Sequence, residues 1–541
     1  MAPTTPTTAG EAIIAGRTAL GIELGSTRIK ACLIDSATAE VLAVGSHEWQ
    51  NELVDRVWTY HLDAVWSGLQ AAFADLAGAV QRDHAVAVTS VGAIGVSAMM
   101  HGYLALDESR ELLVPFRTWR NTSTASAAAE LSERFGVNIP LRWSIAHLHQ
   151  AVLDAEPHLP NVRRITTLAG LVHERLTGVD VLGVGDASGM FPIDPATGGY
   201  DAALVREYDA LAAGRLPVAS ILDLLPEVRS AGEAAGILTA AGGALLDPSG
   251  ALQPGIPLCP PEGDAGTGMV ATNSVAPRTG NVSAGTSIFA MVVLERPLTA
   301  VHHELDVVTT PAGDPVAMVH CNNGASELAA WVGLFERFAV AAGAPIDADL
   351  VFETLFTEAL AGDADAGGLL AYNLLAGEPI IDLPEGRPLF VRTPDSEFTL
   401  ANFMRAQVHG VFATLSIGMR VLADEQVQVD RMFAHGGVFR TAGVAQRILA
   451  NALDAPVAIA STASEGGAWG IAVLAAFGIA PDRGSLADYL RDRVFRTAAV
   501  ATISPDVAGV AGYTTFLDRY RAGLAAERVA VESIAHRTTS L

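Results

Sequence analysis

The sequence predicts an α/β protein built from two similar halves, and three observations support this fold class. Two short apolar runs, 19–24 and 29–34, flank the polar turn Gly25-Ser26-Thr27, which is the pattern of a β-hairpin. The same layout recurs at 280–294 around Gly285-Thr286-Ser287, and such a repeat implies two related halves. The chain has 541 residues, 50% of them hydrophobic and 17% charged, which suits two to four domains at roughly 100–200 residues each.

The segments that follow the first hairpin are predicted to extend the same sheet. Residues 40–46 suit a third strand, so that the hairpin becomes an antiparallel meander. Asp63 can cap a helix whose apolar side chains recur at helical spacing, and these are Trp66, Leu69, Phe73 and Leu76. Residues 92–100 follow as a further strand. A meander, a helix and a strand in this order form a ribonuclease-H-like unit by analogy of fold.

Later segments alternate polar loops with helices. Residues 183–192 are a loop of Gly, Asp and Ser, and 138–150 are a loop that enters a helix. Further helices are expected at 326–341, after Gly436-Gly437, and at 464–477.

Composition and charge exclude several classes of protein. The net charge of −25 argues against binding to nucleic acid or to acidic membranes. The longest apolar run, 468–480, is shorter than the roughly 18 residues of a spanning helix. Cysteines at 32, 259 and 321 are too far apart for a disulfide framework or a zinc site, which favours a reducing, cytoplasmic compartment. Residues 1–16 lack a signal-peptide pattern and are expected to form a disordered tail.

The first turn has the chemistry of a phosphate or metal site. Its small residues and backbone N–H groups suit close approach of a phosphate, and the neighbouring carboxylate of Glu23 suits a divalent cation. The same residues also suit an ordinary hairpin with a solvated tip, so the turn alone does not decide between the two interpretations.

Five runs in a fixed order carry a family resemblance: 22–27 (IELGST), 98–102 (AMMHG), 262–268 (EGDAGTG), 283–287 (SAGTS) and 435–440 (HGGVFR). Together they resemble the FGGY carbohydrate kinase family of the actin/hexokinase/Hsp70 superfamily, over about residues 19–480. The resemblance implies two ribonuclease-H-like domains around a central cleft, and phosphoryl transfer from ATP with Mg²⁺ to a hydroxyl of a sugar or polyol.

The resemblance also implies domain boundaries. After the tail at 1–16, residues 17–275 are expected to form the N-terminal, sugar-binding domain and 276–490 the C-terminal, ATP-binding domain. Residues 491–541 are expected to be a helical extension.

Asp264 corresponds to the catalytic base of the family, in its Gly-Asp-x-x-x-Gly segment. A sugar hydroxyl needs a carboxylate within hydrogen-bonding reach to accept its proton as it attacks the γ-phosphate. The structural alternative is a turn or helix-cap Asp in a glycine-rich loop. Glu23 and Asp264 are expected to hold the Mg²⁺ ion.

The expected ATP contacts lie in both halves. The phosphate turns are Gly25, Ser26 and Thr27 in the first half and Gly285, Thr286 and Ser287 in the second. Gly436 and Gly437 correspond to the loop under the ribose and adenine. Gln446 and Asn451, on the following helix, correspond to adenine-side residues, with ordinary polar residues of a helix surface as the alternative.

The expected sugar contacts lie in the first half. Met100 and His101 correspond to a sugar-contacting pair, and the corresponding run in xylulokinases reads Gln-Met-His-Gly; the alternative for His101 is a structural histidine. Trp119 and Asn121 correspond to the next sugar-side loop. Trp143 and His147 fall where a lid-like helix of the family faces the substrate.

Three departures from the family pattern leave the sugar open. Glu23 replaces the usual Asp, Arg120 lies in a Trp-Arg-Asn run where Trp-Asn-Asp is commoner, and Glu262 stands where Gly is frequent. A pentulose, xylulose or ribulose, is the expected substrate, with a polyol or hexulose as alternatives. Apart from the sugar and ATP, a second copy in a homodimer is the candidate partner.

A different class of function competes with the kinase. Actin and Hsp70 relatives use this superfold as non-catalytic, ATP-dependent switches or assembly proteins, and the sugar-side loops and Asp264 disfavour that interpretation. A Rossmann dehydrogenase is disfavoured because 263–268 has the wrong glycine order, and Walker A spacing is missing.

Overall fold

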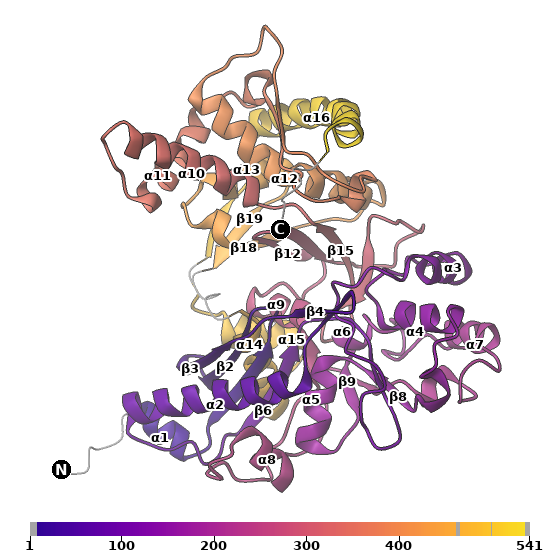
Figure 1. The fold of residues 1–541 in the computed structure, drawn as a ribbon. Coiled ribbons are helices and arrows are strands. Elements are labelled where there is room, and N and C mark those ends of the chain that lie inside the picture. The colour runs from indigo at the N-terminus through magenta and orange to yellow at the C-terminus, as the bar shows by residue number, and fades with distance from the viewer. Residues whose placement is uncertain (1–7, 461–465, 499, 536–541) are drawn as a thin grey trace. The chain divides into compact units, whose positions relative to one another are not determined.

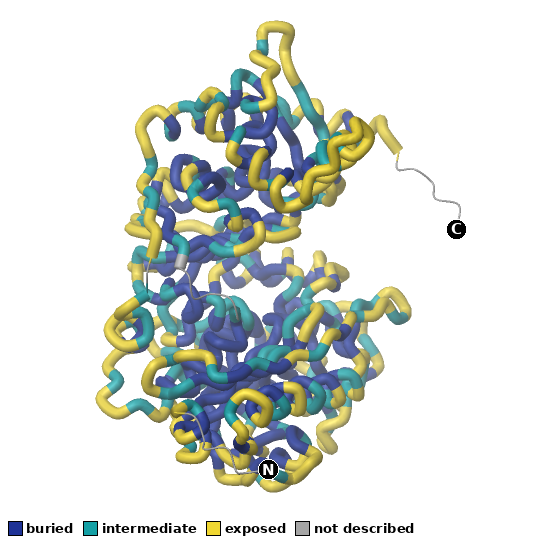
Figure 2. The backbone as a smooth tube through the Cα atoms, turned by 90° about the vertical axis from the view of Figure 1, so that its left-hand side faces the viewer, coloured by how far each residue is buried: buried dark blue, intermediate teal, exposed yellow. Residues whose placement is uncertain are grey.

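The computed structural model describes residues 8–460, 466–498 and 500–535, which fold into two compact units (Figure 1). The first unit comprises Met1–Ala276, Val307–Val316 and Thr462–Ala498, and the second Pro277–Asp306, Ala317–Ser461 and Ala499–Leu541. Each unit has a buried interior beneath exposed loops (Figure 2). Among the described helices, none combines the length and the apolar character needed to cross a bilayer.

A five-stranded sheet forms the centre of the first unit, in the order β11-β6-β1-β2-β3. Its strands are β1 (Thr18–Leu24), β2 (Arg28–Asp35), β3 (Val41–Glu48), β6 (Ala93–Ala98) and β11 (Glu262–Gly263). The first three are antiparallel neighbours, and β6 and β11 run parallel to β1. The predicted hairpin, third strand and later strand are therefore confirmed.

Two helices cover opposite faces of this sheet. Helix α2 (Leu62–His84) packs on β3, where a Cβ on Gly45 would lie 2.2 Å from the backbone nitrogen of Leu76. Helix α14 (Gly466–Ile479) packs on β1, where a Cβ on Gly21 would lie 2.0 Å from the carbonyl oxygen of Ala468. Gly45 and Gly21 pair with adjacent residues of β2, and adjacent strand residues face opposite sides.

Two expectations for this unit are corrected by the structure. Thr8–Ile14 form helix α1, and Ile13 enters the core, so the disordered tail expected over 1–16 does not hold for this part; residues 1–7 lie outside the described residues. Asp63 lies in the first turn of α2, whose N-cap is His61.

The remaining elements of the first unit surround the sheet. They are β4 (Glu52–Val54), β5 (Val57–Thr59), β7 (Leu104–Leu106), α3 (Ala125–Phe135), α4 (Ser144–Leu153), β8 (Arg164–Thr166), α5 (Leu168–Thr177), β9 (Val181–Gly183), α6 (Val184–Ala187), α7 (Ala202–Leu211), β10 (Glu227–Arg229), α8 (Ala240–Leu246), α9 (Asp264–Ala271) and α15 (Leu486–Tyr489). The loop expected over 183–192 thus begins with the short helix α6.

The sheet of the second unit repeats the arrangement of the first. Its middle five strands follow the order β15-β13-β12-β18-β19, and β14 (Asp306–Thr309) and β20 (Val500–Ile503) add one strand at each edge. Strands β12 and β13 are antiparallel, and β12, β18 and β19 are parallel. Their bounds are β12 (Thr279–Ala284), β13 (Ile288–Val293), β15 (Pro315–Cys321), β18 (Arg431–His435) and β19 (Val457–Ala460). The predicted second hairpin is confirmed, with three residues between the paired ends Ala284 and Ile288, against four between Leu24 and Ile29.

Helices pack around this second sheet. They are α10 (Ser326–Ala341), as predicted, α11 (Ala348–Glu358), α12 (Leu400–Asp424), α13 (Val444–Leu453) and α16 (Val507–Ser533). Short strands β14 (Asp306–Thr309), β16 (Leu370–Tyr372) and β17 (Leu389–Val391) complete the list.

The units do not follow the expected domain boundaries. Helix α14, expected in the second domain, belongs to the first unit because its small residues pack on β1. The segment 491–541 is not one extension: its first part stays with the first unit, strand β20 (Val500–Ile503) pairs with β19, and α16 buries Phe516 and Tyr520 in the second core.

Candidate active site

The carboxyl ends of three neighbouring parallel strands define a site in the first unit. Glu23 of β1 is paired with Ser97 of β6, and Ser97 with Glu262 of β11. The residues that follow these strand ends are the turn at 25–27, the Met100-His101 pair, and Asp264. Ligands bind preferentially outside the carboxyl ends of parallel strands, so the structure places these predicted residues where a small molecule is expected.

Asp264 begins helix α9 and is fixed by its neighbours. Its Oδ1 accepts a hydrogen bond from the Met100 N–H at 3.1 Å. The hydroxyls of Ser97 and Thr267, 3.1 Å apart, tie α9 to β6. Burial raises the pKa of Asp264, although the residue keeps part of its surface exposed. A positioned carboxyl with a raised pKa can accept a proton.

Glu23 lies beside Asp264 at the start of helix α14. Its Oε2 accepts a hydrogen bond from the Ala468 N–H at 3.2 Å. Burial, followed by the charge of Asp264, raises the pKa of Glu23 to about 7. A Cβ on Gly467 would lie 2.3 Å from Glu23 Oε1. Glycine at 467 therefore makes room for a carboxylate that is one methylene longer than Asp.

These two carboxyls fit a magnesium ion. The described residues contain no group of three or more His, Cys, Asp or Glu arranged to hold a metal, which disfavours an all-protein cage. Mg²⁺ usually takes one or two carboxylates and completes its shell with water and substrate phosphates. After burial, the negative charge of Asp264 contributes to the raised pKa of Glu23. A dication bound between the two carboxyls would offset this repulsion.

The first turn is held from behind by two aromatic side chains. Trp49 Nε1 donates to the Gly25 carbonyl at 2.7 Å, and the Tyr60 hydroxyl donates to the Ser26 carbonyl at 2.6 Å. The Trp49 N–H donates to the Thr27 carbonyl at 3.2 Å, and the two aromatic rings stack. The Gly25 N–H donates to the Arg28 carbonyl at 3.0 Å. The polar groups left for a ligand are therefore the N–H groups and hydroxyls of Ser26 and Thr27.

His101 lies against the 183–192 segment, which the sequence indicated as a loop but not as part of a site. It has a φ of +70°, and its Nδ1 lies 3.5 Å from the carbonyl oxygen of Gly189. Asp186 is in the same segment, and its Oδ2 accepts a hydrogen bond from the Thr167 hydroxyl at 2.6 Å. Burial raises the pKa of Asp186 to about 7, and the charge of Asp264 adds to the shift. The one signal in the sequence was an acid among small residues.

Glu262 has a structural explanation. Its carboxyl is fully buried and accepts hydrogen bonds from the N–H groups of Gly185 and Asp186, at 3.3 and 3.0 Å. A Cβ on Gly183 would lie 2.1 Å from Glu262 Oε1. Glu262 therefore holds helix α6 against the strand that leads into Asp264.

The loop with Trp119 and Asn121 is corrected in part. The Asn121 side chain accepts from the Trp58 N–H at 2.9 Å and donates to the Trp58 carbonyl at 2.8 Å. Trp119 packs, partly buried, against the core, and the Arg120 guanidinium lies 3.8 Å from the Trp58 ring centre. The amide of Asn121 is therefore used within the fold, which favours a structural role over the expected sugar contact.

Trp143 and His147 are corrected in the same sense. Both are buried at the start of helix α4. The His147 ring stacks on Tyr103 with centroids 6.2 Å apart, and burial lowers the pKa of His147 to about 3. The structure therefore favours a packing role for both residues over the expected position on a lid.

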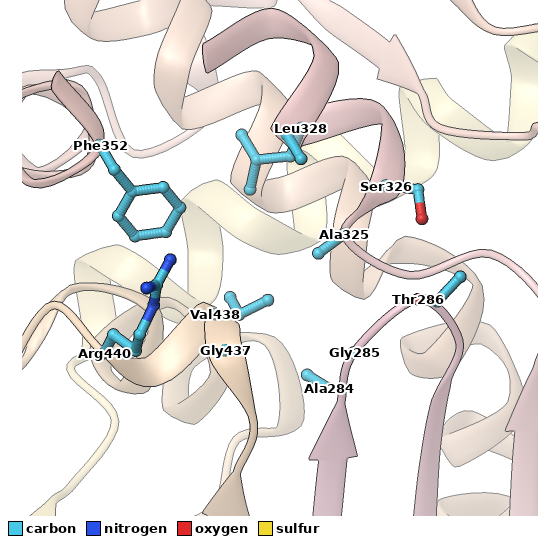
Figure 3. Close-up of a pocket in the computed structure, with 11 residues that line it drawn as sticks. Ala284, Gly285, Thr286, Ala325, Ser326, Leu328, Phe352, Gly437, Val438 and Arg440 are labelled. Carbon is cyan, nitrogen blue, oxygen red and sulfur yellow. The ribbon is translucent and has the colours of Figure 1, made fainter. Parts of the chain in front are cut away.

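The second unit contains a pocket of about 250 Å³ at its own turn (Figure 3). Three of the predicted residues, Gly285, Thr286 and Gly437, line it. The other lining residues are Ala284, Ala325, Ser326, Leu328, Ala329, Phe352, Val438 and Arg440. The pocket thus joins a polar turn to apolar walls, which is typical of a site for a small organic ligand.

Gly436 allows the close contacts on which this pocket depends. It has a φ of +114°, which only glycine adopts readily. A Cβ there would lie 2.1 Å from the carbonyl oxygen of Ala284. The strand end at His435 can therefore pass directly beside the turn that starts at Gly285.

Phe352 and Arg440 form a wall of the pocket that the sequence analysis missed. The Arg440 guanidinium lies 5.2 Å from the Phe352 ring centre and 3.5 Å from the Asp349 carboxylate. Figure 3 shows the two side chains pointing toward each other at one end of the pocket. An aromatic ring and a planar cation offer stacking surfaces for a nucleobase. Arg440 ends the quoted run 435–440, but Phe352 lies in helix α11 outside every quoted run, so nothing in the sequence paired the two.

Gln446 and Asn451 are placed elsewhere. Gln446 is buried and donates to the carbonyls of Val457 and Ala501, both at 2.8 Å. Asn451 donates to Asp506 Oδ2 at 3.1 Å and accepts from the N–H of the same residue at 2.9 Å. The structure therefore favours packing roles for both over the adenine contacts expected from the sequence.

Comparisons with known proteins agree with this geometry. Family models for the N-terminal and C-terminal domains of the FGGY family of carbohydrate kinases match residues 18–270 and 280–479. A xylulose kinase from Haemophilus influenzae is 23% identical over 439 residues, covering 77% of this chain and 82% of that protein. Crystal structures of a xylulose kinase from Rhodospirillum rubrum and a gluconate kinase from Lactobacillus acidophilus have TM-scores of 0.76 and 0.74, at 21% and 17% identity. These alignments cover 94% and 95% of this chain and 99% of each of those chains, and they support the two-domain α/β fold.

Proposed function

Because the chain belongs to the FGGY family of carbohydrate kinases, and is therefore an ATP-dependent carbohydrate kinase, we propose that its acceptor is a small ketose. The candidate acceptors are the pentuloses xylulose and ribulose, in carbohydrate catabolism. The run at 99–102 and the xylulose kinases among the similar proteins favour a pentulose. A gluconate kinase and a glycerol kinase are similar in fold as well, and the second of these keeps a polyol as an alternative, beside a hexulose.

The proposal rests chiefly on one observation, the position of Asp264 at the strand ends beside Met100 and His101. In the proposed reaction Asp264 accepts the proton of a sugar hydroxyl. The hydroxyl oxygen forms a bond to the γ-phosphorus, and the bond from that phosphorus to the bridging oxygen breaks, so that ADP leaves. The His101 ring orients the sugar by a hydrogen bond.

The nucleotide is proposed to use the polar turn of each unit. The backbone N–H groups of Ser26 and Thr27, and those of Thr286 and Ser287, suit phosphate oxygens. The N–H groups of Gly25 and Gly285 donate to the Arg28 and Ser287 carbonyls within the turns. The pocket beside Gly436-Gly437 suits the base, with Phe352 as a stacking surface. The matching strand orders of the two sheets support two ribonuclease-H-like units.

Glu23 and Asp264 are the residues that would hold Mg²⁺. The ion, when bound, neutralises charge on the phosphates as the transfer proceeds. Glu23 is held by the Ala468 N–H, so it keeps its place when the ligands change. The buried cysteines at 32, 259 and 321, which form no disulfide among the described residues, suit a proposed cytoplasmic location. A homodimer is the proposed assembly.

The test is ADP release measured with a panel of pentuloses, hexuloses and polyols, with kcat/KM determined for each. The expected result is sugar-stimulated turnover, highest for a pentulose, and its loss in Asp264→Asn. Turnover highest for a polyol or hexulose would overturn the pentulose. ATP turnover that ignores both the sugar and Asp264→Asn would instead support a nucleotide-dependent switch.

A further inference from the structure

We propose that Glu378 and Asn323 are positioning residues for the nucleotide phosphates. They lock the segment Asn322–Ala325 against the turn Gly285-Thr286-Ser287, although neither residue lines the pocket. The inference rests on the proposed function, because it takes this turn to bind the phosphates of ATP.

The Asn323 side chain is the centre of a hydrogen-bond network with Leu375, Ala376 and Glu378. Its Oδ1 accepts from the N–H groups of Leu375 and Ala376, both at 2.9 Å. Its Nδ2 donates to the Ala376 carbonyl and to Glu378 Oε2, both at 3.1 Å. All the hydrogen-bonding capacity of this buried amide is used, so the side chain has one orientation and fixes the backbone that carries it.

Glu378 supports the same segment from beneath. It is fully buried, and its Oε2 also accepts from the Asn323 backbone N–H at 3.3 Å. Asn373 adds a third contact, because its Nδ2 donates to the Gly324 carbonyl at 2.8 Å. The buried side chains of Glu378 and Asn373 therefore converge on two consecutive residues, Asn323 and Gly324.

Those residues contact the phosphate turn directly. The Gly324 N–H donates to the Thr286 carbonyl and the Ala325 N–H to the Gly285 carbonyl, both at 2.8 Å. A Cβ on Gly324 would lie 2.4 Å from the Gly285 carbonyl oxygen, so the two backbones lie as close as glycine permits. Because these bonds hold the carbonyls, they also set the direction of the turn's N–H groups.

Keeping a carboxyl at this place is costly. Burial raises the pKa of Glu378 to about 7. In addition to burial, the charge of Glu378 raises the pKa values of the neighbouring Cys321 on β15 and Tyr520 on α16. Neither of these neighbours carries a positive charge that would offset it. A buried carboxyl compensated only by amide groups destabilises a fold compared with an apolar residue. A role in holding the phosphate turn accounts for its presence.

The test compares Glu378 with a second buried glutamate of the same unit. Glu527 is also fully buried, and each of the two carboxyls has one oxygen without a hydrogen-bond partner in the described part of the chain. Glu527 Oε1 instead accepts from the Arg387 N–H at 2.6 Å, in a loop that does not contact the turn. Glu378→Ala, Glu378→Gln and Glu527→Ala are made in the full chain, and binding of a non-hydrolysable ATP analogue is measured by calorimetry.

Glu378→Ala is expected to weaken binding of the analogue by about tenfold, because one hydrogen-bonded charge is worth about that factor. Glu378→Gln keeps an acceptor for Asn323 and is expected to recover part of the loss. KM for ATP should rise while KM for the sugar and kcat stay unchanged, whereas a general loss of folded protein would lower kcat alone. Glu527→Ala is expected to bind the analogue within about twofold of the wild type.

If Glu378→Ala does not fold, the proposed role of Glu378 is tested by hydrogen exchange in the Glu378→Gln variant. In Glu378→Gln, peptides covering 284–288 and 322–327 should exchange faster than in the wild type, and in Glu527→Ala they should not. Wild-type binding in both Glu378 variants, or unchanged exchange in the Gln variant, would overturn the inference. A loss of analogue binding in Glu527→Ala as large as that in Glu378→Ala would also overturn the inference. A wild-type protein that does not bind the analogue would refute the proposed nucleotide site itself.

Discussion

Replacing Asp264 with Asn should change activity and stability in opposite directions. Asn is isosteric, and its Oδ1 can still accept the Met100 N–H that Asp264 accepts at 3.1 Å. The variant therefore keeps the local structure, and it removes the group that takes the proton together with one of the two carboxylates proposed for Mg²⁺. Glu23 remains in place to hold the metal ion.

The magnitudes follow from the environment of the side chain. Loss of a general base costs about 10²–10⁴ in kcat, which is about 3–5.5 kcal/mol of activation free energy. Burial raises the pKa of Asp264, so at neutral pH its charge is disfavoured in the folded state compared with the unfolded state. Removing that charge should leave the free energy of unfolding unchanged or raise it by up to about 1 kcal/mol.

Coupled ADP release with the best sugar gives kcat, and thermal unfolding gives stability. Asp180→Asn is the matched control, since Asp180 is another carboxyl of the first unit whose pKa is raised, to about 6, by burial. The control is expected to keep its kcat. An Asp264→Asn protein with more than a tenth of the wild-type kcat, or an equal loss in the control, would refute the assignment of the base.

Three further outcomes are expected. Phe352→Ala should raise KM for ATP about tenfold through lost stacking and leave KM for the sugar unchanged; equal ATP kinetics would contradict its role. Asn451→Ala should lower the free energy of unfolding by about 1–3 kcal/mol without changing KM for ATP. A large rise in KM for ATP would instead support an adenine contact for Asn451. The pKa of Glu156 is lowered to about 2 by its hydrogen bond to His158 and then by Arg117. Because this folded-state pKa is depressed, the stability it contributes should be lost as pH falls from about 4.5 toward 2, so the melting temperature of Glu156→Gln should fall less over that range.

Motifs that join consecutive residues could be predicted from the sequence. The hairpins around Gly25 and Gly285 depend on local alternation and turn chemistry, so their strands were predicted within one or two residues. Asp264 could be predicted because glycines flank it at family spacing. Helix α10 has its apolar positions at helical spacing and matches the expected range.

Side chains whose partners lie far along the chain could not be predicted. Asn121 bonds to Trp58, and Gln446 bonds to a strand that follows 55 residues later, and no local pattern distinguishes such amides from ligand-binding ones. Asp186 lies beside the strand that leads into Asp264 only because Glu262 of β11 accepts hydrogen bonds from its N–H group and from that of Gly185. Phe352 and Arg440 meet at the pocket through tertiary packing, although they are 88 positions apart in the sequence.

The return of α14 to the first unit bears on how the protein can be dissected. Each unit is assembled from three separate stretches of chain, so neither can be produced by a single cut. A fragment ending at Ala276 would lack the Ala468 amide that Glu23 requires. It would also expose the face of β1 at Gly21, on which helix α14 packs. Recombinant halves designed from the linear order would therefore be expected to aggregate, whereas co-expression of complementary pieces is the informative experiment.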